Sequence, residues 1–421
     1  MRILVIGRGG REHAIVWALK KSPKVEKIFC APGNAGIAQL AENVEIGEME
    51  FARLVGFAKE QAIDLVVVGP DDPLAAGIVD EFEAAAIPVY GPRKNAAEIE
   101  GSKIFMKDLL RKYSIPTAKY ETFTDYESAK AYLAQQSVPI VIKADGLAAG
   151  KGVTVCFTRE EADKALEETM VSKSFGSAGD KVVIEEFLEG QEMSILAFVD
   201  GETVRAMSPA QDHKQVFDND KGPNTGGMGT YSPLPHIDSA IIENAIENII
   251  KPTARAMVSE GRPFRGVLFA GLMITKDGPK TIEFNARFGD PETQVVLPRL
   301  ETDLLDIFLA SIDGTLADID IRWSDEAAVC VVLASGGYPG SYPKGFPIDG
   351  LDSVTVPGAL VFHAGTALKD GQIVTNGGRV LGVVGRGAGI AEARANAYAA
   401  AAGITFEGKQ NRTDIAAKAL V

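Results

Sequence analysis

The chain has 421 residues, of which 46% are hydrophobic and 24% charged, and its formal net charge is −14. At about 100–200 residues per domain, this length predicts roughly two to four domains of a soluble globular protein. The negative charge argues against sequence-independent nucleic-acid binding, which depends on clustered lysines and arginines. No apolar stretch is long enough to predict a signal peptide or a membrane span, so we expect a cytoplasmic protein with no membrane partner.

The cysteines and histidines exclude two further classes of site. Cys30, Cys156 and Cys330 are widely spaced within apolar runs, which favours buried reduced thiols of a cytosolic enzyme over a disulfide framework. The four histidines are scattered without metal-ligand spacing, so a zinc site is not expected.

Residues 1–100 alternate short apolar runs with helical stretches such as REHAIVWALKKS and PLAAGIVDEFEAAA. This alternation predicts a parallel sheet with crossover helices, and such sheets bind ligands at the carboxyl ends of their strands. The turns at these ends are GRGGRE (7–12), APGNAG (31–36) and GPDDPLAAG (69–77).

The turn GRGGRE resembles a dinucleotide fingerprint without completing it, because Glu12 stands where the third glycine is needed. A glycine-lined helix start with Arg11 suits a phosphate monoester instead, since free amides and the helix dipole attract an anion. A tight turn between strand and helix, with no ligand, explains this motif equally well.

The middle of the chain begins with a helix, KIFMKDLLRKY, which Ser102 is placed to cap and which carries Lys103 and Lys107 at i, i+4 spacing. A second α/β unit follows, with a hairpin predicted to turn at Asp200-Gly201. The glycine-rich segment 215–235 is predicted to be a long irregular loop, which in a compact domain is usually functional or disordered. From about residue 329, short strands followed by a helix predict a small α+β domain.

The loop GLAAGKGV (146–153) places small residues and Lys151 between two strands. Such a loop can lay backbone N–H groups over phosphate oxygens, although it lacks the P-loop pattern and a flexible hairpin loop is the alternative. Lys143 lies in the preceding apolar strand, where burying a lysine is costly without an anionic partner.

The segment IEFNARFGDPE (282–292) predicts a strand whose polar side chains share one face. In an extended chain Glu283, Asn285 and Arg287 point one way, and Ile282 and Phe284 point the other. A surface ion-pair network is the simplest interpretation of this strand alone. Beside the lysines of the middle segment, a metal and phosphate site becomes the favoured interpretation.

The order and spacing of these groups resemble the ATP-grasp superfamily of carboxylate–amine ligases over residues 100–325. The motifs GRGGREHA, PGNAG, DHKQVFDNDKGPNTGGMG and NARFGDPETQ narrow the resemblance to the glycinamide ribonucleotide synthetase (phosphoribosylamine–glycine ligase) family from end to end. The resemblance implies an α/β and α+β multidomain protein. Its parts would be a parallel α/β domain (1–100), an ATP-grasp domain (101–328) with a mobile lid at about 121–190, and a small α+β domain (329–421).

The resemblance also implies four sets of site residues. ATP would be bound by Lys103, Lys143, Gly150, Lys151, Gly152, Glu185, Glu186, Phe187, Leu188 and Glu192, and of these Lys151 would act in catalysis with Arg287. Mg²⁺ or Mn²⁺ would be held by Glu283 and Asn285. The sugar phosphate would contact Gly9, Gly10, Arg11, Asn34, Gly36, Asp71 and Leu74. Glycine would lie near Asp212, Lys214, Asn224, Thr225, Gly226 and Gly227.

One departure from the superfamily concerns the metal. Many ATP-grasp enzymes carry a second metal-binding acid on the preceding strand, where this chain has Gly271-Leu272. Fewer protein ligands to metal are therefore expected, with phosphates and water completing the coordination.

The function implied is ATP-dependent condensation of glycine with 5-phosphoribosylamine, through glycyl phosphate, in purine biosynthesis. The partners would be these small molecules, and the chain would be a monomer or a weak homodimer. A carboxylase that activates bicarbonate is one alternative, but such relatives lack the GPNTGGMG loop. A non-catalytic nucleotide-binding module is another, but it could dispense with Lys143, Glu283 or Arg287, which are all present. The ligase interpretation requires the lysines and the strand near residue 283 to converge.

Overall fold

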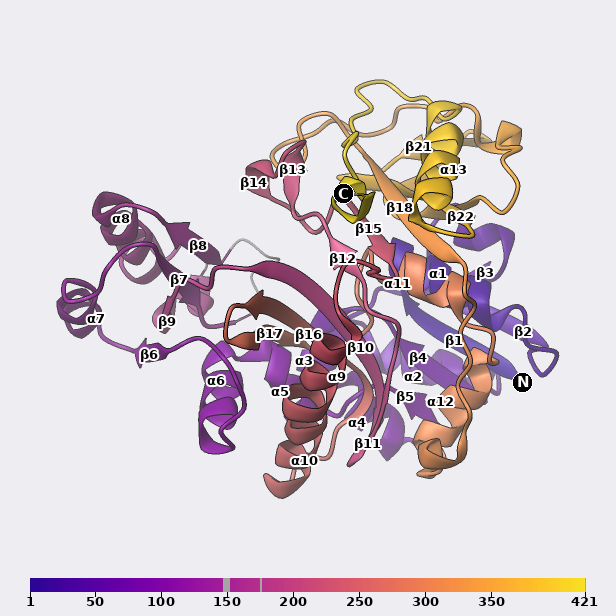
Figure 1. Ribbon diagram of the computed structural model, residues 1–421. Helices are drawn as coiled ribbons and strands as arrows, with labels where there is room; N and C mark the ends of the chain where they lie inside the picture. Colours follow the sequence, from indigo (N-terminus) through magenta and orange to yellow (C-terminus); the bar gives the residue numbers. More distant parts are fainter. Residues whose placement is uncertain (147–151, 175, 421) are drawn as a thin grey trace.

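The computed structural model describes residues 1–146, 152–174 and 176–420. Figure 1 shows a lobe of β6–β9 with α7 and α8 projecting from the body of the molecule, and a second lobe that contains the carboxyl-terminal strands. In the described part of the chain, no helix combines the length and apolarity needed to cross a membrane.

The amino-terminal sheet is parallel, as predicted, with the strand order β3-β2-β1-β4-β5. Its strands are β1 (Arg2–Gly7), β2 (Lys27–Pro32), β3 (Glu42–Asn43), β4 (Leu65–Val68) and β5 (Val89–Tyr90). Its helices are α1 (Gly10–Leu19), α2 (Phe51–Glu60), α3 (Asp71–Ala76), α4 (Ile78–Ala84) and α5 (Lys94–Gly101). The helix predicted across residues 73–86 is broken at Gly77, whose φ of +100° ends α3 in the left-handed region.

The middle of the chain forms two antiparallel four-stranded sheets. The first has the order β6-β9-β7-β8 and contains β6 (Tyr120–Phe123), β7 (Ile140–Ala144), β8 (Val153–Cys156) and β9 (Val182–Glu186). The second has the order β11-β10-β16-β17 and contains β10 (Gln191–Asp200), β11 (Thr203–Ala206), β16 (Arg265–Thr275) and β17 (Gly278–Asn285). Because residues 187–190 join β9 to β10, this short segment connects the two sheets.

Helices cover both sheets. The helices of the middle segment are α6 (Lys103–Lys112), α7 (Tyr126–Leu133), α8 (Arg159–Met170), α9 (Ser239–Ala245) and α10 (Lys251–Ser259). The helices α7 and α8 close a separate core over the first sheet, built from residues such as Leu133, Ile142 and Leu166. A π-helical turn at Ile246–Ile250 joins α9 to α10 just before Pro252.

The third sheet has the order β12-β15-β18-β22-β19, and α13 (Ile390–Ala402) packs on it. Its strands are β12 (Gln211–Asp212), β15 (Gly229–Ser232), β18 (Ala327–Ala334), β19 (Leu360–His363) and β22 (Arg379–Gly387). A smaller hairpin joins β20 (Thr366–Lys369) to β21 (Gln372–Thr375). Since β12 and β15 belong to the middle of the chain, the domain boundary at residues 328/329 stays a prediction.

The expectation of an irregular loop at 215–235 is wrong. The segment forms the hairpin β13 (Gln215–Phe217) and β14 (Lys221–Asn224), and it continues into β15. The hairpin turns at Asn219 and Asp220, which both have positive φ (59° and 53°) and therefore fit the primed turns that match strand twist. The pairing of β15 with β18 bridges about a hundred residues, so no local pattern reveals it.

Candidate active site

The charges of four cationic side chains act on the carboxylate of Glu283 on β17. Burial acts to raise the pKa of this carboxyl, but the charges of Lys214, Lys143, Lys103 and Arg287 outweigh it and lower the pKa. These cations come from four separate segments of the chain. The structure therefore brings Lys103 and Lys143 to the acidic strand, as the sequence predicts, and adds Lys214. Gly150 and Lys151 lie outside the described residues.

The strand before β17 leaves room for Glu283. Gly271 on β16 pairs directly with Glu283, and a Cβ at this glycine would lie 3.3 Å from Glu283 Cγ. The position where the superfamily carries a second acid is thus directly beside the first. A bulge follows at Ile282, between the pairs Gly271–Glu283 and Leu272–Thr281, and it breaks the simple alternation expected for this strand.

Lys143 has the anionic partner that its burial requires. Glu185 on β9 bridges Lys143 and Lys107 by buried ion pairs, and the two lysines lower the pKa of this carboxyl against the effect of burial. Lys143 Nζ also donates to the carbonyl of Ile282 at 3.2 Å, so the first sheet touches β17 of the second sheet here. Glu185 belongs to the segment expected at the nucleotide, but its side chain forms ion pairs within the protein.

Lys103 stands at the start of α6, which is tied to the loop that follows β7. Ser102 Oγ caps the helix by accepting a hydrogen bond from Phe105 N, and Asp145 Oδ1 accepts from Ile104 N at 3.1 Å. Lys103 Nζ donates to the carbonyl of Gly146 at 2.8 Å. The predicted cap is confirmed, and Asp145 is a helix-capping residue that sequence reasoning missed.

The connection between the two sheets carries the residues expected to hold the base. Glu186 Oε1 accepts from Lys119 N at 3.0 Å, and the Phe187 ring lies 5.8 Å from that of Phe157 between centroids. Leu188 is half-buried and Gly152 is buried. Glu192, on β10, pairs with Lys214 at 2.9 Å. This ion pair joins the residue expected to hold the ribose to a residue expected to bind the substrate glycine.

Arg287 follows the end of β17 and is held by Glu100 of α5. The ion pair between Arg287 Nη2 and Glu100 Oε1 measures 2.9 Å, and the same Nη2 donates to Asn285 Oδ1 at 3.1 Å. Glu100 also accepts from Ala286 N at 2.7 Å, so one carboxylate fixes both the guanidinium and the backbone after the strand. Glu100 carried no signal in the sequence, because it lies on a helix nearly 190 residues earlier.

The amino-terminal turn is built around Glu12. Its carboxylate accepts from Gly9 N and from Arg11 Nε, both at 2.6 Å. A Cβ at Gly7 or at Gly69 would lie 2.4 Å or 2.1 Å from Glu12 atoms, so these glycines make room for that side chain. The residue that spoils the dinucleotide fingerprint thus fills the space at the carboxyl ends of β1 and β4.

Arg11 joins this turn to the segment after β17. Its Nη1 donates to the carbonyl of Phe288 at 3.0 Å, and its backbone N–H approaches Asp290 Oδ2 at 3.4 Å. Gly10 packs against Gln294, since a Cβ there would lie 2.6 Å from the amide nitrogen of that side chain. The charges of Arg287 and Arg11 lower the pKa of the Asp71 carboxyl against the effect of burial.

Two other residues expected at the sugar phosphate have internal side chains. Asn34 Oδ1 accepts from the N–H groups of Gly36 and Ile37 at 2.9 Å, and its Nδ2 donates to the carbonyl of His363 at 2.8 Å. Leu74 is buried in the main core. A ligand at this edge would therefore meet the backbone of these turns, whereas Arg11 and Asp71 offer side chains.

The residues expected at glycine close the base of the β13–β14 hairpin. Thr225 donates to the carbonyl of Lys214 through its N–H (2.8 Å) and its hydroxyl (2.7 Å), and Gly227 N donates to Thr225 Oγ1 at 3.0 Å. Gly227 has φ +113°, and a Cβ there would lie 2.7 Å from Asp212 Oδ1. Asn224 ends β14 and is exposed.

Two residues that the sequence did not single out complete this side of the site. Arg379 Nη1 donates to the carbonyls of Gly226 (2.6 Å) and Asp290 (2.8 Å), so a residue of β22 holds the glycine turn. Glu292 is buried, and its charge and the burial of Asp212 raise the pKa of the Asp212 carboxyl. Glu292 is the last residue of the quoted segment 282–292 and Arg379 follows Gly377-Gly378, but no pattern in the sequence marks either as a site residue.

The oxygens of Glu283 and Asn285 fit a hard divalent cation by their chemistry. Within the described ranges, no group of three or more His, Cys, Asp or Glu side chains could hold a metal ion. A metal here would therefore take two ligands from β17 and the remainder from a bound molecule.

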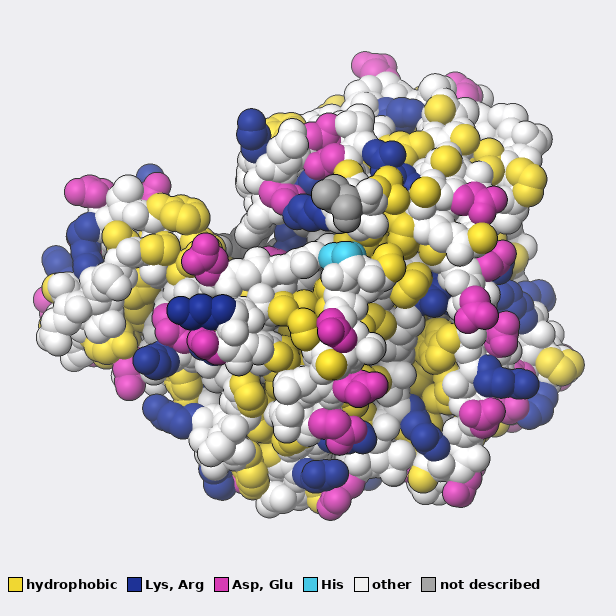
Figure 2. Space-filling model, in the orientation of Figure 1, with side chains coloured by type: hydrophobic (Ala, Val, Ile, Leu, Met, Phe, Trp, Pro, Cys, Tyr) yellow, Lys and Arg dark blue, Asp and Glu magenta, His cyan; other side chains and the backbone are white. Residues whose placement is uncertain are grey.

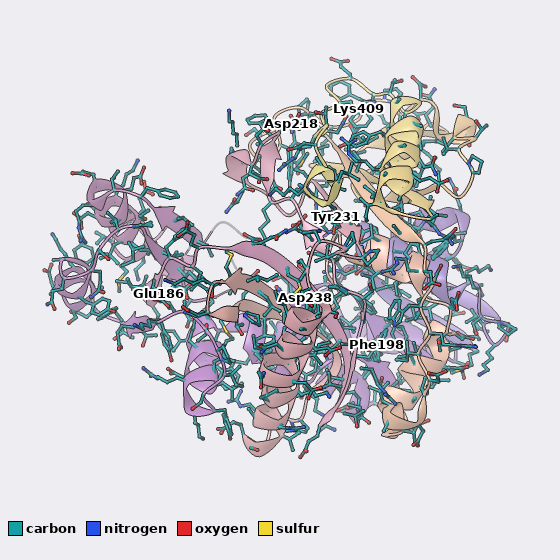
Figure 3. The ribbon with its side chains drawn as sticks, viewed as in Figure 1. Glu186, Phe198, Asp218, Tyr231, Asp238 and Lys409 are labelled. Carbon is teal, nitrogen blue, oxygen red and sulfur yellow. The ribbon has the colours of Figure 1, made fainter. Side chains whose placement is uncertain are left out.

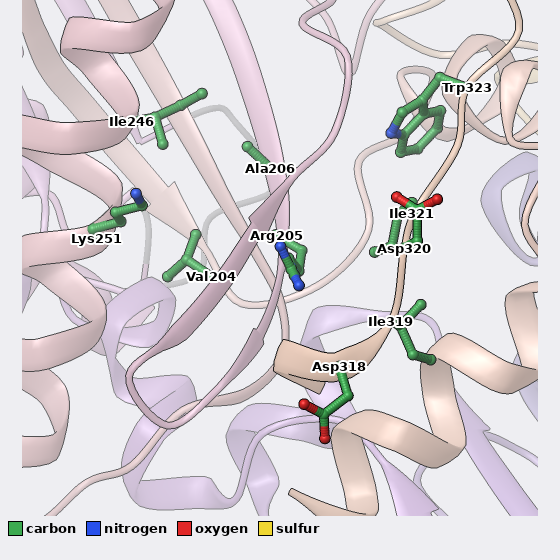
Figure 4. A pocket seen from close by; sticks show the side chains of 10 residues that line it. All are labelled: Val204, Arg205, Ala206, Ile246, Lys251, Asp318, Ile319, Asp320, Ile321 and Trp323. Carbon is green, nitrogen blue, oxygen red and sulfur yellow. The ribbon is translucent and has the colours of Figure 1, made fainter. Parts of the chain in front are cut away.

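One hollow of the described surface lies elsewhere. It measures about 450 Å³ and contains none of the residues predicted for the site; its lining includes Val204, Lys251 and Trp323 (Figure 4). Figure 2 shows a notch between the β6–β9 lobe and the carboxyl-terminal lobe, with Lys and Arg side chains on its wall. We take Glu283, with the four cations whose charges act on it, as the centre of the candidate site.

The comparisons with known proteins cover the whole chain. Three family models match, described as the N domain (residues 1–100), the ATP-grasp (A) domain (101–293) and the C domain (328–418) of phosphoribosylglycinamide synthetase. A phosphoribosylamine–glycine ligase of Vibrio parahaemolyticus is 52% identical over 100% of this chain and 99% of that protein. One from Caldanaerobacter subterraneus is 53% identical over 99% of this chain and 100% of that protein.

Solved structures agree with this picture. A crystal structure of a phosphoribosylamine–glycine ligase from Thermotoga maritima superposes with a TM-score of 0.86 at 37% identity, covering 99% of this chain and 100% of that one. A biotin carboxylase from Campylobacter jejuni reaches a TM-score of 0.74 at 14% identity, over 97% of this chain and 92% of that one, and shares the fold alone.

Proposed function

Because the chain belongs to the phosphoribosylglycinamide synthetase family, it is an ATP-dependent ligase of purine biosynthesis, and we propose that it joins glycine to 5-phosphoribosylamine through glycyl phosphate. In the first step the glycine carboxylate attacks the γ-phosphorus of ATP and releases ADP. In the second, the amine attacks the acyl carbon, phosphate leaves with the bonding electron pair, and the amide forms with loss of the amine proton.

The cation cluster at Glu283 is the observation that carries this proposal. Phosphoryl transfer is catalysed mainly by positioning and by neutralising charge on the transferred group, and four cations around one carboxylate supply that field. A divalent metal held by Glu283 and Asn285 would supply further positive charge at the phosphates. Arg287, fixed by Glu100, would face the group in transfer.

The two middle sheets would hold the nucleotide between them. In this arrangement Lys103 and Lys143 contact the phosphates, and the loop with Gly150, Lys151 and Gly152 lies over them. The backbone of 185–188, with Glu186, reads the adenine base, and Glu192 holds the ribose. Two observations support this placement. Lys143 of the first sheet donates to Ile282 O of the second, and residues 187–190 connect the two sheets.

The two other substrates would approach from opposite sides. The sugar phosphate lies on the amino-terminal turns, where Gly9, Gly10, Arg11 and Asp71 face the segment 287–290. Glycine lies at the hairpin base, beside Asp212, Lys214 and the turn 224–227. The contact of Arg11 with Phe288 O and of Arg379 with Asp290 O brings both sides to one segment.

Glycyl phosphate hydrolyses readily, so the site must exclude water while the amine attacks. We infer that the β6–β9 lobe acts as the lid, since it has its own core and is joined to the body through short segments. We further propose that the chain works in the cytoplasm as a monomer or a weak homodimer, with no nucleic-acid or membrane partner.

The direct test is release of ADP that depends on both glycine and phosphoribosylamine, with the amide product identified by mass. Bicarbonate in place of glycine should give no ADP; bicarbonate-dependent turnover would favour the carboxylase alternative. Glu283→Gln keeps the side-chain size but removes the charge, and it should lower the rate by about 10²-fold or more. Full activity of a folded Glu283→Gln variant would remove the metal and phosphate assignment.

A further inference from the structure

The β13–β14 hairpin begins and ends beside the residues that are expected to bind the substrate glycine. Lys214 precedes β13 and Thr225 follows β14. The backbone N–H and the hydroxyl of Thr225 both donate hydrogen bonds to the carbonyl of Lys214. Any movement of the hairpin therefore moves the two ends of the glycine site. The hairpin itself has a register irregularity between Gln215 and Phe217 and exposed residues in β14. A two-stranded hairpin of this kind is marginally stable without other support.

That support comes from residues 411–420, the last described residues, here called the carboxyl-terminal tail. Arg412 is fully buried, and its guanidinium donates to Gln215 O (3.1 Å), to Asp220 Oδ1 (3.0 Å) and to Asp414 (2.7 Å). It thus reaches both the first strand of the hairpin and its turn.

Other tail groups hold the turn from the same side. Thr413 N donates to Asp218 Oδ1 at 2.8 Å, and Asn219 N donates to Asp414 Oδ2 at 2.8 Å. Lys418 Nζ pairs with Asp220 Oδ2 at 2.6 Å. Asn219 and Asp220 are the two turn residues in the left-handed region, so the tail binds the positions of the hairpin that are least favourable for an ordinary backbone.

The tail also touches the base of the hairpin. Ala416 N donates to His213 Nε2 at 3.4 Å, and His213 Nδ1 lies 3.2 Å from the carbonyl of Gly229. His213 sits between Asp212 and Lys214, which are both expected at glycine. The tail is therefore in contact with both ends of the hairpin, its turn and its base. Figure 3 labels Asp218 at the hairpin turn, on the edge of the carboxyl-terminal lobe.

We propose that Arg412 is a positioning residue for the glycine site, acting through the β13–β14 hairpin that the carboxyl-terminal tail clamps. Arg412 does not touch substrate in this arrangement. Its buried charge is balanced by Asp414 and Asp220, and it fixes the hairpin so that Lys214 and the turn 224–227 stand at the spacing that glycine needs. The proposal rests on the proposed function, because that function places glycine at this hairpin.

Two variants test the clamp. Arg412→Gln removes the charge and most donors but keeps a polar side chain. The double variant Asp220→Asn with Lys418→Ala weakens the same clamp at side chains that are about one third to one half exposed (35% and 52%), so it leaves the core untouched. Loss of one or two charged hydrogen bonds predicts a rise of about tenfold in the KM for glycine, with the KM for ATP changed less than about twofold.

Lys409→Ala serves as the matched control. Lys409 also donates to backbone carbonyls near the end of the chain, those of Ala401 (3.2 Å) and Ile404 (2.6 Å), but it makes no contact with the hairpin (Figure 3). This variant should leave the KM for glycine unchanged. An equal rise of that KM in Lys409→Ala would show a general loosening of the lobe and would overturn the proposal.

Hydrogen exchange of residues 215–224 separates failure of the clamp from failure of the proposed function. The clamp predicts faster exchange there in both test variants. Unchanged exchange together with an unchanged KM for glycine would overturn the proposal. Faster exchange with an unchanged KM for glycine would also overturn it. So would faster exchange in which the KM values of all three substrates rise equally. The proposed function is read separately, from glycine-dependent ADP release by the unaltered chain.

Discussion

Arg11 illustrates how one residue can look ambiguous in sequence and yet have a defined place in the structure. Burial acts to lower the pKa of its guanidinium, but Glu12 and Asp290 raise it, so the charge is kept in an interior position. Its Nε is held by Glu12 and its Nη1 by Phe288 O. A fixed charge at a glycine-lined helix start is suited to bind an anion, which favours the phosphate interpretation over a turn with no ligand.

Replacing Arg11 by alanine should therefore raise the KM for phosphoribosylamine by about tenfold or more, because a charged contact to phosphate is lost. The KM for ATP should change little, since the nucleotide is proposed to lie between the middle sheets. Steady-state kinetics with each substrate varied in turn would measure this difference.

Arg8 offers a matched control in the same turn. Its side chain is 69% exposed and pairs with Glu48 at 3.3 Å, whereas Arg11 donates to the segment after β17. Arg8→Ala should leave both KM values nearly unchanged. An unchanged sugar-phosphate KM in Arg11→Ala, or an equal effect in Arg8→Ala, would contradict the amino-terminal site.

At the scale of elements, the ion pairs of Glu185 join α6, β7 and β9. Lys107 comes from the helix, Lys143 from one strand and Glu185 from the next, and all three side chains are at most 5% exposed. A buried charge left without a partner is far more costly than a missing pair. The carboxylate is the member that balances the other two, so its loss should matter most.

Glu185→Gln should accordingly lower the free energy of unfolding by about 3–5 kcal/mol, because two buried ammonium groups lose the carboxylate with which both form ion pairs. Lys107→Met removes one lysine and leaves a balanced pair of Lys143 and Glu185, so its cost should be smaller. Urea denaturation of both variants would measure the difference. Equal destabilisation by the two would show that charge balance is not what holds these elements together.

Elements whose pattern is local were predictable from sequence, and those that depend on distant partners were not. The strands of residues 1–100, the hairpin near residue 200 and the cap at Ser102 are encoded by neighbouring residues, and the structure confirms these elements. The hairpin turn lies at Gly201-Glu202, one residue later than predicted, because Asp200 still pairs with Thr203. The strand at Gly229–Ser232 exists because β18 pairs with it from far along the chain. The bulge at Ile282 likewise depends on the register with β16.

The same distinction applies to the candidate site. Lysines in apolar strands and polar residues on alternate positions are visible in sequence, so Lys143 and Glu283 were identified. The partners that position them, such as Glu100 and Arg379, lie on other elements and show no pattern of their own. The roles given to Gly150 and Lys151 stay predictions, because these residues lie outside the described part of the chain.

At the scale of the whole molecule, two histidines join the first and last parts of the chain. His13 on α1 and His363 on β19 are both buried, and His13 Nδ1 accepts a hydrogen bond from the backbone N–H of His363 at 2.8 Å. Burial lowers the pKa of His13 to about 3 and that of His363 to about 4. Both rings are therefore neutral in the folded protein at any pH in the physiological range.

This arrangement predicts a loss of stability on mild acidification. Above pH 6.5, the approximate pKa of histidine in the unfolded chain, both rings are neutral in the folded and unfolded states, so their titration does not affect stability. Below that pH the rings become protonated in the unfolded chain but stay neutral in the folded chain. Each histidine then lowers the free energy of unfolding by up to about 1.4 kcal/mol per pH unit, until the pH reaches its folded pKa.

The variant His13→Asn isolates one of these contributions, because an asparagine amide oxygen can accept the bond from His363 N–H but does not titrate. Between pH 6.5 and pH 5, the free energy of unfolding should fall by roughly 2 kcal/mol less in this variant than in the unaltered chain. Urea denaturation at a series of pH values would give both slopes. Parallel slopes would mean that His13 is protonated in the folded state, and that the contact between the two ends of the chain tolerates its charge.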